Sequence, residues 1–119
     1  MALSELNIPK AKGGLLFDML YKKPKILITG SLGLVGSEAV DFFRNKGCEV
    51  IGIDNNMRSE LFGVAESVSE YTIDIRNETA INLLFQEHKF DAIIHCAAQP
   101  SHDWSQKEPL TDFDINARA

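Results

Sequence analysis

Three glycines follow a short apolar run in the first third of the chain, and their spacing can hold phosphate. Residues 26–28 are apolar, and an amphipathic helical pattern starts at about Leu34. Around that start lie glycines at intervals of three residues: Gly30, Gly33 and Gly36. They would permit a tight turn, a close approach of phosphate to the backbone, and close packing of the helix. The free N–H groups of the helix would then face a pyrophosphate. The stretch predicts a dinucleotide-binding turn, with a purely structural glycine turn as the alternative.

An acidic residue ends the next apolar stretch at a position suited to a ribose. Residues 49–53 predict a second strand, and Asp54 follows, 18 positions after Gly36. A carboxylate there accepts hydrogen bonds from the adenosine ribose diol. It would repel a 2′-phosphate, and Asn55 supplies no cation, so the sequence favours NAD over NADP. The alternative is a solvated acid at a strand end.

The glycine turn must be positioned by alternating strands and helices. Beyond residues 26–28 and 49–53, strands are predicted at residues 69–73 and 90–96. The fold class is therefore α/β, with a Rossmann-type, doubly wound parallel sheet ordered 3-2-1-4. Small residues after the fourth strand, Ala97 and Ala98, would leave room for a cofactor beside the first strand.

Two helices are predicted between these strands. In the first, Val35, Ala39, Phe42 and Phe43 form an apolar stripe, and Gly47 ends the helix. Asn77 caps the second, in which Ile81, Leu84, Phe85 and His88 fall on one side. Residues 99–109 are predicted to be a loop, and residues 110–119 the start of a further helix. Residues 1–24 form an N-terminal extension, and residues 25–119 a partial NAD-binding domain.

Composition limits the classes of partner. The 119 residues carry a net charge of −5, which argues against nucleic acid or an anionic membrane as a partner. No apolar run approaches the ~20 residues of a membrane span, and no signal peptide is recognised. The isolated Cys48 and Cys96 fit buried thiols in a reducing cytoplasm. A metal site is disfavoured, because the histidines and cysteines match no compact ligand spacing.

Four motifs together resemble a known family. Thr-Gly-Ser-Leu-Gly-Leu-Val-Gly at residues 29–36, Asp54, Asp74-Ile75 and His-Cys-Ala-Ala at residues 95–98 resemble the extended short-chain dehydrogenases/reductases of the NAD-dependent epimerase/dehydratase family. More narrowly, residues 53–58, 97–104 and 112–116 resemble its CDP-paratose 2-epimerase (CDP-tyvelose epimerase) branch.

The resemblance implies a role for each matching residue. The pyrophosphate would be held by Gly30, Gly33, Leu34, Val35 and Gly36. Asp54 and Asn55 would hold the adenosine ribose, and Asp74 and Ile75 the adenine edge. The remainder of the cofactor site would be lined by Cys96, Ala97, Ala98, Gln99 and Asn116. Residues 101–104 would face the substrate, a nucleotide sugar, with a CDP-sugar favoured.

The resemblance also implies an activity and a missing part. Family members epimerise a sugar through a transient ketone with bound NAD, using a Ser/Thr and a Tyr-x-x-x-Lys pair. Tyr21 and Lys25 match that spacing, but Pro24 lies between them and Lys25 opens a strand. No catalytic residue is assigned, and we expect an inactive N-terminal part of a longer enzyme. A homodimer is expected only of the full-length protein.

Two alternatives remain open. A non-catalytic NAD-binding sensor or interaction module would keep the glycine turn without the acid–base pair. Within the family, a sugar-nucleotide 4-epimerase or 4,6-dehydratase would share the same N-terminal motifs.

Overall fold

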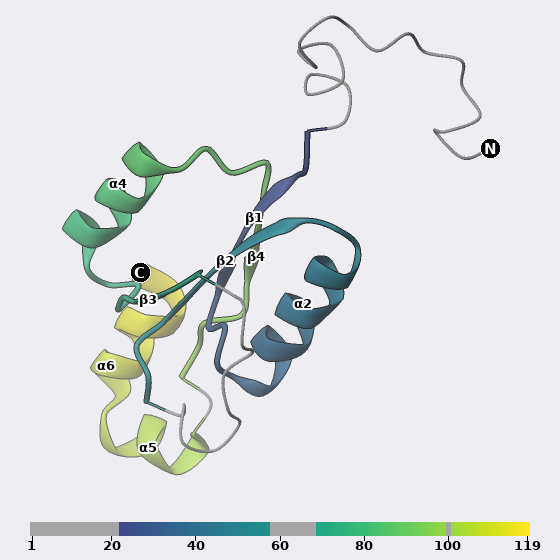
Figure 1. Ribbon diagram of the computed structural model, residues 1–119. Helices are drawn as coiled ribbons and strands as arrows, with labels where there is room; N and C mark the ends of the chain where they lie inside the picture. Colours follow the sequence, from purple (N-terminus) through teal and green to yellow (C-terminus); the bar gives the residue numbers. More distant parts are fainter. Residues whose placement is uncertain (1–21, 58–68, 100) are drawn as a thin grey trace, which may run out of the picture.

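Four parallel strands form one sheet in the order β3-β2-β1-β4, as the sequence predicts. The computed structural model describes residues 22–57, 69–99 and 101–119, and the expected apolar segment at residues 15–20 lies outside these ranges. The elements are β1 (Lys25–Thr29), α2 (Leu34–Asn45), β2 (Glu49–Asp54), β3 (Ser69–Thr72), α4 (Glu78–Glu87), β4 (Ala92–His95), α5 (His102–Lys107), α6 (Pro109–Phe113) and a π-helix, Asp114–Arg118 (Figure 1).

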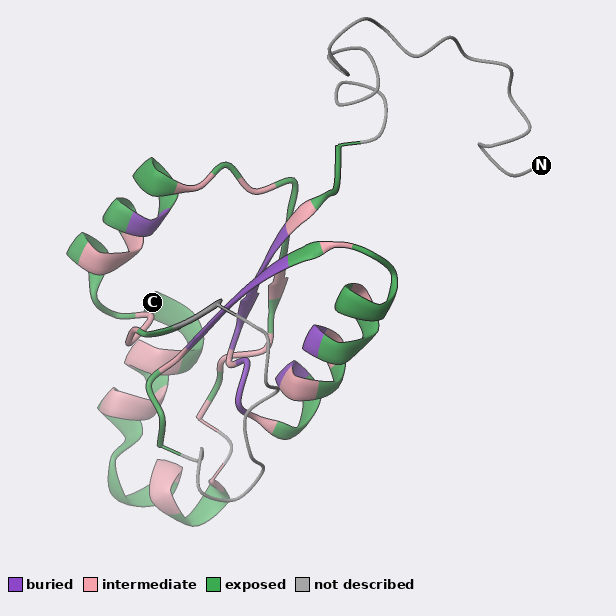
Figure 2. Ribbon diagram, viewed as in Figure 1, coloured by how far each residue is buried: buried purple, intermediate pink, exposed green. Residues whose placement is uncertain are grey.

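The central strand β1 is buried on both faces of the sheet. Its residue Ile28 pairs with Gly52 of β2 on one side and with Ile94 of β4 on the other. Alternate side chains of a strand point to opposite faces, so Ile28 packs with Val40 of α2 and its neighbour Leu27 with Leu84 of α4. The two helices therefore lie on opposite sides of the sheet (Figure 1), and burial is concentrated along β1 and β2 between them (Figure 2).

Helix α2 begins directly after the glycine turn, and Gly47 follows its end with a φ of +84°. The predicted apolar stripe is partly wrong. Gly36 and Val40 are buried, whereas Val35 and Phe42 are 67% and 55% exposed. The sheet contacts the face defined by Gly36 and Val40, four residues apart, and Val35 and Phe42 fall beside that face.

Helix α4 has the predicted N-terminal cap. The side chain of Asn77 accepts a hydrogen bond from the N–H of Ala80 at 3.1 Å. Leu84 is 3% exposed and anchors the helix to the sheet, with Ile81 partly buried beside it. Phe85, expected on the same side, is 44% exposed.

The segment after β4 differs from the prediction. Residues 99–109 were predicted to be a loop, but His102–Lys107 form α5, because the Ser101 hydroxyl caps it by accepting from the N–H of Trp104 at 3.3 Å. The predicted final helix is present as α6 and the π-helix. Strands β3 and β4 are shorter than predicted, ending at Thr72 and His95. Among the described helices, none is long and apolar enough to cross a membrane.

Candidate functional site

The turn after β1 depends on glycine at Gly30. Its φ is +67°, a conformation that side chains rarely adopt. The N–H groups of Gly30 and Ser31 both donate to the carbonyl of Ile53, at 2.8 and 3.2 Å, which holds the turn against β2. A Cβ at Gly30 would lie 2.7 Å from the backbone nitrogen of Ala97. Glycine therefore permits both the turn and the close approach of the chain after β4.

The other two glycines differ in what surrounds them. A Cβ on Gly36 would lie 1.9 Å from the carbonyl oxygen of Gly30, so glycine is required there for α2 to pack on the turn. A Cβ on Gly33 would meet only that same oxygen, at 3.3 Å. This contact is tight but needs a shift of only a few tenths of an ångström, far less than at Gly36. No other described atom lies within 4 Å of that Cβ, so a ligand can approach the backbone of Gly33 closely.

The amino end of α2 lies next to that space. No side chain caps the helix, and its first turn contains no acidic residue. The first N–H groups of an α-helix have no partner within the helix, and together with the helix dipole they attract anions. Leu34 and Val35 are 66% and 67% exposed. The end of the helix is thus open to an anionic group such as a pyrophosphate.

The carboxylate of Asp54 lies directly beside the glycine turn. Its Oδ2 accepts from the N–H of Leu32 at 3.1 Å, and its Oδ1 from the N–H of Asn56 at 2.8 Å. A carboxylate offers about four acceptor positions, so Asp54 keeps capacity for two further hydroxyl donors. Its neighbour Asn55 accepts from the N–H of Met57 at 3.2 Å through its side-chain oxygen, which leaves the amide NH₂ as a donor.

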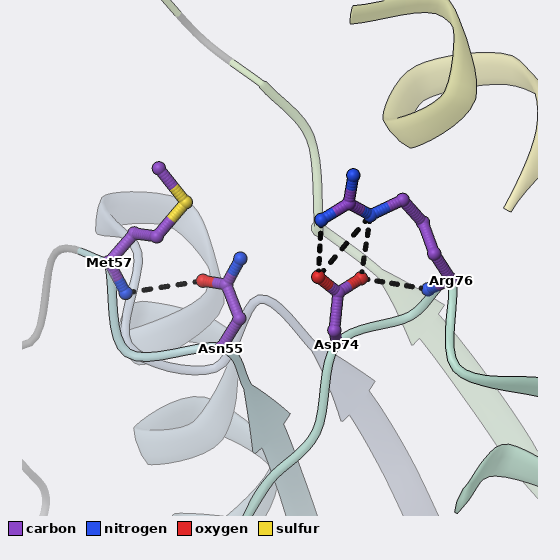
Figure 3. Close-up of polar contacts among 4 residues, drawn as sticks. All are labelled: Asn55, Met57, Asp74 and Arg76. Atoms are coloured by element: carbon purple, nitrogen blue, oxygen red, sulfur yellow. Dashed lines mark hydrogen bonds and ion pairs between the residues drawn. The ribbon is translucent and has the colours of Figure 1, made fainter. Parts of the chain in front are cut away.

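Asp74 follows the end of β3 and is held by Arg76. Figure 3 shows Arg76 against the carboxylate of Asp74, with Nη2 at 2.6 Å from Oδ2 and Nε at 3.0 Å from Oδ1. These hydrogen bonds from Arg76 lower the pKa of Asp74 below its ordinary value of 3.8, while partial burial acts in the opposite direction. The partly buried side chain of Ile75 packs against the core under α4.

Hydrogen bonds to Thr29 of β1 hold the end of β4. The site residues predicted from the sequence did not include Thr29. The hydroxyl of Thr29 lies 2.7 Å from Nδ1 of His95 and accepts from the N–H groups of Cys96 and Ala97, each at 3.2 Å. Thr29 is 6% exposed. The predicted residues Cys96 and Ala97 thus have a structural role next to Gly30, whereas Ala98 is exposed.

Gln99 and Asn116 form a second contact, on the segment after β4. The side-chain oxygen of Asn116 accepts from the N–H of Gln99 at 2.7 Å, and its amide donates to Asp112 at 3.1 Å. The side chain of Gln99 accepts from the N–H of Ser101 at 3.0 Å. Asn116 therefore connects the π-helix to the loop that follows β4. The sequence-based prediction placed Gln99 and Asn116 in the same site but did not predict a contact between them.

The histidines and cysteines do not converge. Among residues 22–57, 69–99 and 101–119, no group of three metal-ligating side chains is found. His88 instead lies 3.4 Å from Nζ of Lys25 and 3.3 Å from the hydroxyl of Tyr71. Cys48 and Cys96 are both free, as expected, but they are half-buried and not buried.

A glycine turn, an open helix end and a carboxylate therefore meet at the carboxyl edge of a parallel sheet. The family model described as "NAD dependent epimerase/dehydratase family" matches residues 26–119. The chain belongs to this family. NAD is the cofactor of the family, and the four-stranded sheet is the N-terminal part of its Rossmann fold.

Individual family members give the same assignment. UDP-glucose 4-epimerase of Halalkalibacterium halodurans is 34% identical over 91 residues, covering 76% of this chain. The structure of UDP-glucose 4-epimerase of Thermus thermophilus in complex with NAD is 30% identical, with a TM-score of 0.72 over 78% of this chain and 30% of that one. The enzyme of Thermotoga maritima with UDP-glucose is 31% identical, with a TM-score of 0.72 over 76% of this chain and 29% of that one.

The chain matches only part of the length of its relatives. The chain spans 27% of the length of the Halalkalibacterium halodurans enzyme, so the matched part is the N-terminal sheet and not the whole protein. The relatives named here are UDP-glucose 4-epimerases, and they do not confirm the narrower resemblance to CDP-paratose 2-epimerase.

Proposed function

We propose that this chain is the NAD-binding portion of a nucleotide-sugar epimerase. The observation that carries the proposal is the arrangement at the end of β1. The carbonyl oxygen of Gly30 is the one described neighbour within 4 Å of a Cβ placed on Gly33, the amino end of α2 has no side-chain cap, and Asp54 is hydrogen-bonded to the turn through Leu32. This arrangement offers a pyrophosphate and an adjacent ribose the groups that each would need.

Residues at the ends of three strands would each bind a different part of NAD. The glycine turn and the first residues of α2 would bind the pyrophosphate, through Gly30, Gly33, Leu34, Val35 and Gly36. Asp54 would accept the ribose hydroxyls, Asn55 would donate to them, and the segment of Asp74 and Ile75 would face the adenine. Backbone and small side chains after β4 would line the remaining part of the site, with Asn116 holding Gln99 in place.

In the proposed reaction, NAD takes a hydride from the sugar and returns it, so that epimerisation has no net redox change. The residues of this chain bind and orient the cofactor. We assign them no proton transfer, because the sequence offers no Tyr-x-x-x-Lys pair apart from the interrupted match of Tyr21 and Lys25.

The names of the relatives favour a UDP-hexose over a CDP-sugar as substrate, since both structures and the curated relative cited above are UDP-glucose 4-epimerases. The second candidate substrate is a CDP-sugar of the CDP-paratose type, favoured by the sequence of residues 97–104. The proposed compartment is the cytoplasm, whose reducing conditions match the free thiols of Cys48 and Cys96.

Turnover by the protein that carries this chain, read to the end of its open reading frame, tests the proposal. We expect it to bind NAD and to convert UDP-glucose to its C4 epimer, detected by NMR. Conversion of CDP-paratose alone would favour the second candidate. NAD binding without turnover of either sugar would favour the binding-module alternative, and absence of NAD binding would overturn the proposal.

A further inference from the structure

The end of β3 is attached to the part of β2 that carries Asp54. The N–H of Ile73 donates to the carbonyl of Asp54 at 2.9 Å, and the side chain of Asn56 donates to the hydroxyl of Thr72 at 2.9 Å. Asp74 follows immediately. In the order β3-β2-β1-β4, a nucleotide with its pyrophosphate at β1 and its ribose at β2 places its base toward β3.

Arg76 directs three N–H groups to the carboxylate of Asp74. The backbone N–H of Arg76 lies 2.9 Å from Oδ1 of Asp74, Nε lies 3.0 Å from Oδ1 and 3.3 Å from Oδ2, and Nη2 lies 2.6 Å from Oδ2. A carboxylate has about four acceptor positions. Arg76 therefore fixes the plane of the carboxylate and leaves it room for about one further donor.

Adenine has such a donor in its exocyclic amino group. We propose that Arg76 is a positioning residue that fixes the carboxylate of Asp74 as the acceptor for this amino group, so that the site selects adenine over purines without it. The inference rests on the proposed function, because it needs the adenosine half of NAD at β2 and β3. The pair also compensates the charge of Asp74.

The proposed role needs the shape of the arginine side chain and not only its positive charge. Arginine presents its N–H groups in a planar fork that matches a carboxylate, whereas lysine is a point charge on a flexible chain. Arg76→Lys would keep the charge and lose the fork.

The test compares NAD with nicotinamide hypoxanthine dinucleotide, in which a carbonyl replaces the amino group. Affinities of the cofactor-free protein that carries this chain are measured by calorimetry. We expect the wild type to prefer NAD by about tenfold, the size of one hydrogen bond to a charged group. We expect Arg76→Ala to reduce the preference to within about twofold of unity, and Arg76→Lys to give an intermediate value. Arg44→Ala, which removes an exposed arginine from the last turn of α2, is the matched control and keeps the wild-type ratio.

A double-mutant cycle shows whether Arg76 acts through Asp74. In an Asp74→Ala background, Arg76→Ala is expected to leave the ratio unchanged. The inference is overturned if Arg76→Ala, or Arg76→Lys where the alanine variant does not fold, keeps the wild-type preference. An equal effect of Arg76→Ala with and without Asp74 overturns it as well. A wild type that binds neither dinucleotide contradicts the proposed function itself, and the inference with it.

Discussion

The hydroxyl oxygen of Thr29 lies 2.7 Å from Nδ1 of His95, across the last paired residues of β1 and β4. The same oxygen accepts from the N–H groups of Cys96 and Ala97. One nearly buried side chain thus fixes the direction in which the chain leaves β4. That direction matters for the site, because the backbone of Ala97 packs directly against Gly30.

Replacing Thr29 by Val is expected to destabilise the protein by about 2 kcal/mol, because the N–H of Ala97 and the ring of His95 lose their hydrogen-bond partner beside a buried side chain. The N–H of Cys96 keeps the carbonyl oxygen of Thr29, at 3.0 Å. Urea unfolding measures the change. Thr29→Ser is the matched control, since it keeps the hydroxyl and removes one methyl group, at a cost of about 1 kcal/mol. A valine variant as stable as the serine variant would show that the hydroxyl has no stabilising role.

Alanine should destabilise the protein much more at Gly36 than at Gly33. At Gly36 the new Cβ would overlap the carbonyl oxygen of Gly30, so we expect a loss of about 3 kcal/mol or more. At Gly33 the contact is 3.3 Å and φ is −76°, which alanine adopts freely, so we expect a change below about 1 kcal/mol. Thermal unfolding of both variants checks the contrast. Equal melting temperatures would contradict the geometry of the turn.

Asp54 is expected to set the preference for NAD over NADP. Asp54→Ala should lower the affinity for NAD by about tenfold, since charge-assisted hydrogen bonds to the ribose are lost. The affinity for NADP should fall less or rise, because the repulsion of its 2′-phosphate disappears. Calorimetric titrations with both cofactors measure the ratio. Asp41→Ala, an exposed acid on α2, is the control of equal charge. The same shift in both variants would indicate a general charge effect.

The contact between Asp74 and Arg76 predicts a dependence of stability on pH. The folded-state pKa of Asp74 is lowered, chiefly by hydrogen bonds from Arg76. The stabilisation is therefore present above the unfolded value of about 3.8 and is lost as the pH falls through the folded pKa. Wild type and Asp74→Asn should differ near neutral pH, by no more than about 1 kcal/mol for this exposed pair. The difference should shrink as the pH falls below 3.8. A difference that grows in acid would contradict the assignment.

Much of this arrangement could be predicted from local sequence. The apolar run before Gly30 and the helical pattern after it are adjacent in the chain, so their order specifies a strand, a turn and a helix. Asp54 ends its own strand, and parallel strands place their carboxyl ends on one edge. The predicted alternation of strands and helices was enough to predict the strand order of the sheet.

The remainder depends on contacts that local patterns do not encode. Thr29 and His95 are 66 residues apart, and only the pairing of β1 with β4 brings them together. Val35 and Phe42 fit an apolar stripe, yet the sheet contacts the neighbouring face of α2.

The contact between Arg76 and Asp74, by contrast, had a local signal. The two residues are two positions apart, a spacing at which an acid can accept a hydrogen bond from the backbone N–H two residues on. The cap of Ser101 on α5 was a similar local signal.

The most direct test of the NAD site is the effect of Gly33→Val on NAD binding by the protein that carries this chain. Calorimetric titration of the wild type should show saturable binding of NAD. The valine side chain would enter the space above Gly33, so its affinity should fall by about tenfold or more, equal to at least one lost hydrogen bond to a charged group. Unfolding by urea should remain cooperative in both proteins. Equal NAD affinities in two folded proteins, or no binding by the wild type, would contradict a pyrophosphate site at this turn.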